Sequence, residues 1–63
     1  MPVVTIQMHE GRTVEQKRAL IEGVTKVVNE TTGAPYENIT IFIDDVPFTN
    51  LAKAGVLLCD KKK

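Results

Sequence analysis

A proline stands at position 2 of this chain, directly after the initiating methionine. We expect Met1 to be removed, so that Pro2 becomes the N-terminal residue and its ring nitrogen becomes a secondary amine. An amide nitrogen is essentially non-basic, whereas a free amine can take up and return a proton and so act as a general acid or base. Proline is also tolerated as the first residue of a strand, because the N–H that it lacks costs least there. Pro2 therefore has a catalytic and a purely structural interpretation.

Arg12 is the second residue whose position suggests chemistry. It follows the first expected strand and lies beside Gly11, which permits a close backbone approach. A guanidinium in such a loop can hold a carboxylate through two parallel hydrogen bonds. The alternative is a surface arginine near a helix start, although the helix dipole disfavours a cation there. Arg12 is thus the first candidate for binding an anionic substrate.

Three other groups of side chains could carry chemistry, and the sequence argues against each of them. His9 and Glu10 could form an acid–base pair, but adjacent strand or loop residues tend to point apart. Asp44 and Asp45 fit a solvated strand end better than a metal site. Cys59 has no histidine near it in the sequence and is not expected to be a nucleophile. With one histidine and one cysteine in the chain, we expect neither a metal nor an internal disulfide.

Two strands are expected to position these residues. Alternating side chains predict a strand from Pro2 to Met8 that is largely apolar on both faces. A second strand is expected at Ile39–Asp44, with Ile41 and Ile43 on one face and Phe42 on the other. A strand that is apolar on both faces is usually covered twice, once by its own helix and once by something else. In a chain this short, we expect the second cover to be another subunit.

A long helix is expected between the two strands. Thr13 and Gln16 form a capping box, so the helix should begin at Val14, and Gly33 stands where a left-handed cap should end it. A helix of about 19 residues spans roughly 30 Å. Strand, helix and strand form a β-α-β unit with a parallel strand pair and a right-handed crossover. With a small hairpin expected near the C-terminus, the predicted fold class is α+β.

The length of the chain limits what it can do alone. A domain of 63 residues buries only about 60% of its unfolded surface and is marginal as a monomer. We expect one domain over residues 1–63, stabilised by oligomerisation because a disulfide and a metal are not expected. Eight basic residues balance eight acidic ones, so no nucleic-acid partner is expected.

Nothing in the sequence suggests a membrane or an export route. No apolar run approaches about 18 residues, so we expect no transmembrane helix and no membrane partner. The N-terminus lacks the basic segment of a signal peptide. The single thiol fits a reducing compartment, and we expect a cytoplasmic protein.

Several short motifs occur together along the chain. They are Met1-Pro2, Glu10-Gly11-Arg12-Thr13, Glu15-Gln16-Lys17, Thr32-Gly33-Ala34 and Ile41-Phe42-Ile43. In this order and at this length, the chain resembles the 4-oxalocrotonate tautomerase family of small tautomerases. The resemblance implies a β-α-β subunit that dimerises into a four-stranded sheet, commonly with three dimers assembling into a hexamer. It also implies that Pro2 is the catalytic amino-terminal proline and that Arg12 binds a substrate carboxylate.

The chain departs from the family pattern at two positions. Thr40 stands where members of the founding type carry a second arginine, and Leu51 stands near the place of an aromatic side chain. Loss of the cation removes one substrate contact and one stabiliser of a developing enolate. We expect Thr40 and Leu51 to line the substrate site, and turnover of dicarboxylated dienols to be inefficient.

The activity that this resemblance implies is a cofactor-independent isomerisation. Arg12 would hold a small carboxylate substrate, a 2-hydroxydienoate or an arylpyruvate-like acid. Pro2 would move a proton from the 2-hydroxyl group to carbon 3 or 5, which is a 1,3-keto-enol tautomerisation. Two alternatives stay open at this stage. One is a hydratase or dehalogenase that acts on unsaturated acids and needs a carboxylate to activate water, and the other is a catalytically degenerate oligomeric binding protein.

Overall fold

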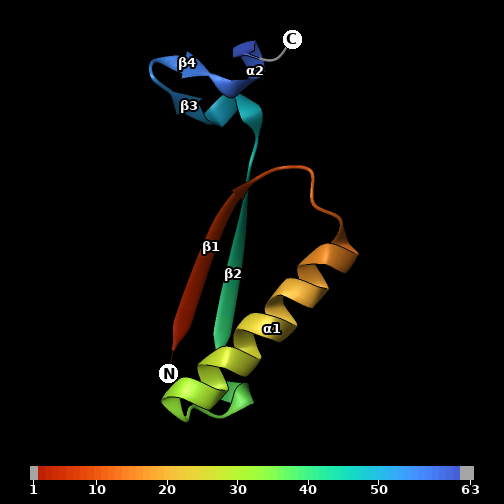
Figure 1. Ribbon diagram of the computed structural model, residues 1–63, viewed down its shortest axis with the longest axis vertical. Coiled ribbons are helices and arrows are strands. Elements are labelled where there is room, and N and C mark those ends of the chain that lie inside the picture. Colours follow the sequence, from red (N-terminus) through yellow and green to blue (C-terminus); the bar gives the residue numbers. More distant parts are fainter. Residues whose placement is uncertain (1, 62–63) are drawn as a thin grey trace.

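The fold is built around two parallel strands joined by one long helix. The computed structural model describes residues 2–61, with β1 at Val3–His9, α1 at Val14–Thr32 and β2 at Thr40–Val46. β1 and β2 pair in parallel over their whole length, and α1 runs diagonally beside them (Figure 1). The predicted β-α-β unit is thus confirmed. Both strands begin one residue later than predicted and end one or two residues later.

The ends of α1 are set by its capping residues. The Thr13 hydroxyl accepts a hydrogen bond from the Gln16 N–H at 3.1 Å, and the Gln16 side-chain oxygen accepts one from the Thr13 N–H at 2.9 Å. Gly33 adopts the left-handed conformation, with φ of 80°, and its N–H donates to the Asn29 carbonyl at 3.0 Å. The capping box and the glycine cap give α1 the predicted bounds. A short 3-10 helix, η1 (Tyr36–Asn38), then leads into β2.

The two faces of the sheet differ in how they are covered. The half-buried side chains alternate along both strands on one face, namely Val4, Ile6, Met8, Ile41 and Ile43. Asp45 of β2 lies on the same face as Ile41 and Ile43, and it forms an ion pair with Lys17 of α1. This face is therefore the one that α1 covers. On the opposite face, Val3 is 57% exposed and Phe42 is 58% exposed. Phe42 therefore lies on the face opposite its two isoleucine neighbours, as predicted.

The chain beyond β2 forms a small group at one end of the molecule. A 3-10 helix, η2 (Phe48–Asn50), precedes the antiparallel hairpin of β3 (Ala52–Lys53) and β4 (Val56–Leu57), and the short helix α2 (Leu58–Lys61) follows. Figure 1 shows this group standing past the carboxyl ends of β1 and β2, well away from α1. The hairpin was predicted, whereas α2 was not. Within residues 2–61, no helix combines the length and apolar character needed to cross a membrane.

Residues 2–61 of a single chain form no fully buried core. Each of their side chains is at least partly exposed. The radius of gyration is 15.0 Å, whereas a compact chain of this length should have one of about 11 Å. Folding is driven mainly by apolar area removed from water, and a lone chain of this shape removes little. We therefore expect contacts with other chains to supply the missing burial.

The cap of α1 gives a first testable prediction. Thr13→Ala should lower the free energy of unfolding by about 1 kcal/mol per chain, because it leaves the Gln16 N–H without its partner. Urea denaturation at a fixed protein concentration measures this, since the stability of an oligomer depends on concentration. Thr31→Ala is the matched control. Its hydroxyl only donates to the Val27 carbonyl within the helix, and alanine favours helix. Equal losses in the two variants would contradict the capping role.

Candidate active site

Pro2 and Thr40 lie together at the amino end of the sheet. The Thr40 N–H donates to the Pro2 carbonyl oxygen at 3.1 Å, and Thr40 pairs with Val3 at the start of the sheet. Both residues are half-buried. Met1, whose removal we expect, lies outside the described residues. The structure therefore places one predicted substrate-binding position beside the predicted catalytic proline of the same chain.

Arg12 and Leu51 lie at the other end of the sheet. Arg12 is exposed in the loop after β1 and lines a pocket of about 260 Å³ with Met8, Gln16 and Leu20. Leu51 is half-buried and follows η2. It lines a different pocket of about 470 Å³, together with Gln7, Met8, His9, Val46 and Asn50. We call this second cavity the His9 pocket. Met8 is the one residue that borders both pockets.

The length of β1 separates the two halves of the predicted site. Pro2 precedes this strand and Arg12 follows it, and seven strand residues span about 23 Å at about 3.3 Å per residue. One chain alone therefore does not gather the four predicted site residues around one substrate. It presents Pro2 with Thr40 at one end, and Arg12 with Leu51 at the other.

Three contacts fasten the residues just before Arg12 to the end of β2 and to η2. The Glu10 N–H donates to the Val46 carbonyl at 3.0 Å, and the Glu10 carboxylate accepts from the Phe48 N–H at 3.4 Å. The rings of His9 and Phe48 lie 5.2 Å apart between centroids, tilted by 56°. These contacts fix the Arg12 loop relative to the segment that carries Leu51. No pattern in the sequence pointed to Phe48 in this role, because its partners are nearly 40 residues away along the chain.

His9 is oriented by its own backbone neighbourhood. Its Nδ1 lies 3.2 Å from the Glu10 carbonyl oxygen. A carbonyl only accepts, so this contact assigns the proton to Nδ1 and leaves Nε2 as an acceptor in the neutral ring. The Glu10 carboxylate contacts Phe48 instead. The acid–base pair of His9 and Glu10 is therefore not formed.

The two adjacent aspartates have structural partners. Asp45 forms the ion pair with Lys17, and Asp44 accepts a hydrogen bond from the Gln7 amide at 3.3 Å. Across residues 2–61, no three His, Cys, Asp or Glu side chains are grouped so as to hold a metal ion. Cys59 is exposed on α2. A reaction that adds water or removes halide needs a carboxylate to activate water, and both aspartates are already engaged.

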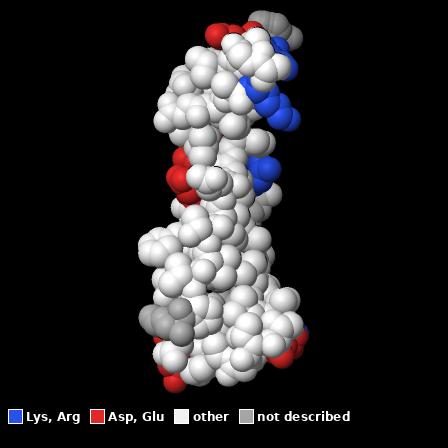
Figure 2. All heavy atoms as spheres, turned by 90° about the vertical axis from the view of Figure 1, so that its left-hand side faces the viewer, with Lys and Arg blue, Asp and Glu red and all other residues white. Residues whose placement is uncertain are grey.

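The outer edge of β1 is free and uncharged. β2 is the only strand paired with β1 within residues 2–61, and the sequence of β1 contains no Lys, Arg, Asp or Glu. Figure 2 looks at the side of the molecule on which β1 lies, and most of its surface is without charged residues. Proteins usually protect an unpaired strand edge with charges, prolines or bulges. This edge lacks such protection and is available to another chain.

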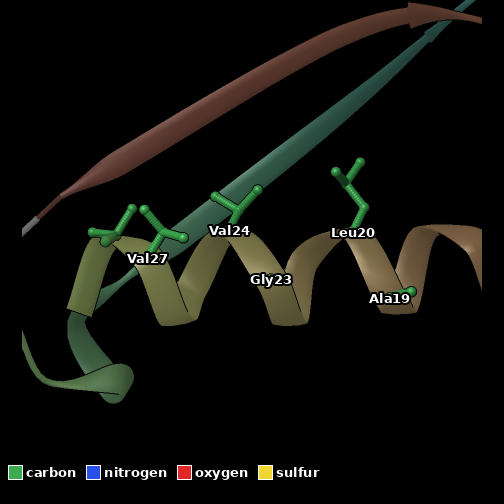
Figure 3. A pocket seen from close by; sticks show the side chains of 6 residues that line it. Ala19, Leu20, Gly23, Val24 and Val27 are labelled. Carbon is green, nitrogen blue, oxygen red and sulfur yellow. The ribbon is translucent and has the colours of Figure 1, made fainter. Parts of the chain in front are cut away.

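An apolar groove runs along α1. It has a volume of about 490 Å³, and its lining residues are Ala19, Leu20, Gly23, Val24, Val27 and Val28. Figure 3 shows Leu20, Val24 and Val27 projecting on the side of the strands, with Gly23 and Ala19 leaving a low surface beside them. Val27 is 56% exposed. The groove offers no reactive group, but it is a second surface that one chain leaves uncovered.

Known proteins resemble this chain along its whole length. Residues 2–61 match the family described as tautomerase enzyme. The 2-hydroxymuconate tautomerase of Bacillus subtilis (strain 168) is 53% identical over 60 residues, which cover 95% of this chain and 97% of that protein.

Solved structures agree with the sequence match. YwhB, a homologue of 4-oxalocrotonate tautomerase, superposes with a TM-score of 0.91 at 51% identity, covering 97% of this chain and 100% of that one. Trans-3-chloroacrylic acid dehalogenase, in a form covalently inactivated by 3-bromopropiolate, gives a TM-score of 0.77 at 42% identity over 90% and 93% of the two chains. The α+β fold expected from the sequence is thus confirmed.

The attachment of the Arg12 loop to η2 can be tested directly. Glu10→Ala removes the acceptor of the Phe48 N–H, so the exchange of this amide with deuterium should become about fivefold faster, as expected for one lost hydrogen bond. Amide exchange followed by NMR measures this. Glu15→Ala is the matched control, because Glu15 pairs only with Arg18 on the exposed surface of α1. Unchanged exchange at Phe48 in Glu10→Ala would show that the carboxylate does not hold η2.

Proposed function

The chain belongs to the tautomerase family, and its relatives named 2-hydroxymuconate tautomerase are isomerases. We propose that it catalyses 1,3-keto-enol proton transfer on a 2-hydroxydienoate or an arylpyruvate-like acid. Pro2 is the acid and base of this reaction, and Arg12 binds the substrate carboxylate. The observation that carries the proposal is the family match over residues 2–61, which includes both Pro2 and Arg12. The relative named 2-hydroxymuconate tautomerase supports an enol acid as the substrate class.

The chemical step needs one proton acceptor and one anchor. Arg12 holds the carboxylate through a charge-assisted pair of hydrogen bonds. The neutral amine of Pro2 takes the proton of the 2-hydroxyl group, and the electrons of that O–H bond form the carbonyl. The electrons of the adjacent double bond take a proton back from the Pro2 ammonium at carbon 3, or at carbon 5 through the conjugated system. One proton leaves oxygen and one arrives at carbon, so the amine is regenerated.

The separation of Pro2 from Arg12 supports a site shared between two chains. Two β1 edges that pair about a two-fold axis perpendicular to the sheet run antiparallel. This arrangement gives a four-stranded sheet with the two β1 strands at its centre. It sets Pro2 of one chain beside the carboxyl end of the second chain's β1, where Arg12 and the His9 pocket lie. The unpaired and uncharged edge of β1 favours this contact.

The two-fold axis of the proposed dimer also determines where the other uncovered surfaces lie. It keeps both α1 helices on one face of the joined sheet, where the apolar groove of each helix is available to the other. The opposite face still exposes Val3 and Phe42. Association of three dimers through that face would cover it, which is the hexamer expected from the sequence. In this proposal, the homo-oligomer both completes the site and supplies the burial that one chain lacks.

Blocking the Pro2 amine should abolish the activity. An alanine inserted between Met1 and Pro2 keeps the Pro2 nitrogen as an amide, and kcat/KM for phenylenolpyruvate should fall at least about 100-fold, the usual contribution of a general base. Ultraviolet absorbance follows ketonisation, and intact mass spectrometry establishes the N-terminus of each sample. The control carries the same alanine after Lys63. Equal rates for a chain with a blocked Pro2 and one with a free Pro2 amine would refute the mechanism.

A shared site also predicts complementation between two inactive chains. Chains with a blocked Pro2 and chains with Arg12→Ala should each be inactive alone. When they are co-expressed with different tags, mixed dimers contain one site with both intact residues, and random pairing restores about a quarter of the normal sites. Activity per chain of the whole co-expressed pool measures this, because purification through both tags would enrich the mixed dimers. If Pro2 and Arg12 of the same chain formed the site, mixing would restore nothing.

A further inference from the structure

The pocket that Arg12 lines has two walls, which come from different elements. Besides Arg12, its lining residues are Met8 of β1 and Gln16 and Leu20 of α1. Met8 lies on the face of the sheet that α1 covers. The separation between α1 and the sheet at this end of the molecule therefore sets the width of the pocket.

The ion pair of Lys17 with Asp45 connects these two walls. Lys17 follows Gln16 directly on α1, and Asp45 is the residue of β2 that pairs with Met8 in the parallel sheet. Each member of the ion pair is thus the neighbour of a residue that lines the pocket. Within residues 2–61, this is the one ion pair that joins α1 to the sheet.

We propose that Lys17 and Asp45 are positioning residues, whose ion pair holds α1 against the sheet so that Arg12 is correctly placed to bind the substrate carboxylate. This inference rests on the proposed function, in which Arg12 is the carboxylate anchor. Neither Lys17 nor Asp45 is among the described residues that line the pocket. Both act through Arg12 rather than by touching the substrate.

The loop that carries Arg12 is tied to the end of β2 on both of its sides. Before Arg12, the Glu10 N–H donates to the carbonyl of Val46 at 3.0 Å. After Arg12, the tie is the ion pair of Lys17 with Asp45, the residue that precedes Val46 in β2.

Between the two ties, the chain is stiff on one side of Arg12 and adaptable on the other. The capping box makes Thr13 continuous with the first turn of α1, so a shift of that turn carries Arg12 with it. Gly11, with φ of 119°, has a conformation that glycine adopts easily. Arg12 itself is in no ion pair within residues 2–61. Its position therefore depends on where the first turn of α1 is held.

The second ion pair of α1 shows what a merely local pair looks like. Glu15 and Arg18 belong to the same helix, and their side chains are 83% and 62% exposed. The side chains of Lys17 and Asp45 are 27% and 41% exposed. Exposed ion pairs contribute little, and partial removal from water strengthens the attraction between charges. The Glu15–Arg18 pair cannot hold α1 to the sheet, so it provides a matched control.

A direct role of Lys17 as a second cation for the substrate makes a different prediction. In that case Asp45→Asn would release the Lys17 ammonium and improve the binding of a carboxylate, whereas Lys17→Met would weaken it. If the ion pair positions Arg12, both substitutions weaken the binding. The sign of the Asp45→Asn effect therefore distinguishes the two roles.

Kinetics of the assembled protein with a free Pro2 amine test the positioning role. Lys17→Met and Asp45→Asn should each raise KM for phenylenolpyruvate about tenfold and change kcat less than about threefold, because a misplaced anchor weakens ground-state and transition-state binding alike. Loss of folded protein alone would instead lower kcat and leave KM unchanged. Lys17→Arg retains the ion pair and should retain KM. Arg18→Met removes the same charge with the other ion pair and is the control. Gel filtration and circular dichroism verify assembly.

Carboxylate binding at Arg12 can also be measured without turnover. Arg12 and Arg18 are the only arginines of the chain, so in Arg18→Met the one arginine Nε–Hε signal in an NMR spectrum belongs to Arg12. Benzoate, a stable monocarboxylate, should shift this signal. With Arg18→Met as the background, Lys17→Met and Asp45→Asn should each raise the Kd for benzoate about tenfold, in line with KM.

The outcomes separate this proposal from the function beneath it. A KM in Lys17→Met and Asp45→Asn no higher than in Arg18→Met would overturn the positioning role and leave the tautomerase proposal intact, and so would a lower KM in Asp45→Asn. Failure of the unmodified protein with a free Pro2 amine to turn over the enol acid would overturn the proposed function. Benzoate then decides the positioning role. Weaker binding in both variants would support it, whereas equal binding, or an Arg12 signal that benzoate leaves unmoved in the Arg18→Met background, would overturn it.

Discussion

The parallel pairing of β1 with β2 determines where every candidate group lies. Parallel strands start at the same end of a sheet, so Pro2 and Thr40 share one end while the segments that follow β1 and β2 share the other. Arg12 and Leu51 stand on those following segments. Seven residues of strand, about 23 Å, keep the proton acceptor of the proposed reaction away from its carboxylate anchor. A second chain is the simplest means of joining them.

Association with other copies of the chain would both supply the missing core and complete the divided site. A lone chain leaves one edge of β1, the groove of α1 and one face of the sheet uncovered. All three surfaces are poor in charge, which lowers the cost of removing them from water. Burial of these surfaces between copies of the chain would stabilise the fold. The same contacts would bring the amino end of one sheet to the carboxyl end of another.

Local features were predictable from the sequence, and contacts between distant segments were not. Thr13, Gln16 and Gly33 act within a few residues of themselves, so their types and spacing were enough to place α1. The end of β2 was placed too early, because the pairing of Asp45 and Val46 with Met8 and His9 depends on the register between strands.

The same distinction holds for the candidate site. Pro2 and Arg12 were singled out by their residue types and positions, and the family resemblance implied their roles. The contact of Glu10 with Phe48 joins residues far apart in the chain, and the orientation of His9 depends on a single backbone carbonyl. Neither has a pattern in the sequence that could reveal it.

In a lone copy, none of the side chains of residues 2–61 is fully buried, and this bears on how the protein behaves on dilution. In the proposed oligomer, folding and association would be one event, so the rate at which active enzyme forms would depend on the second or a higher power of chain concentration rather than the first. A low concentration of the chain would then be enough to abolish the activity, without an inhibitor or a protease.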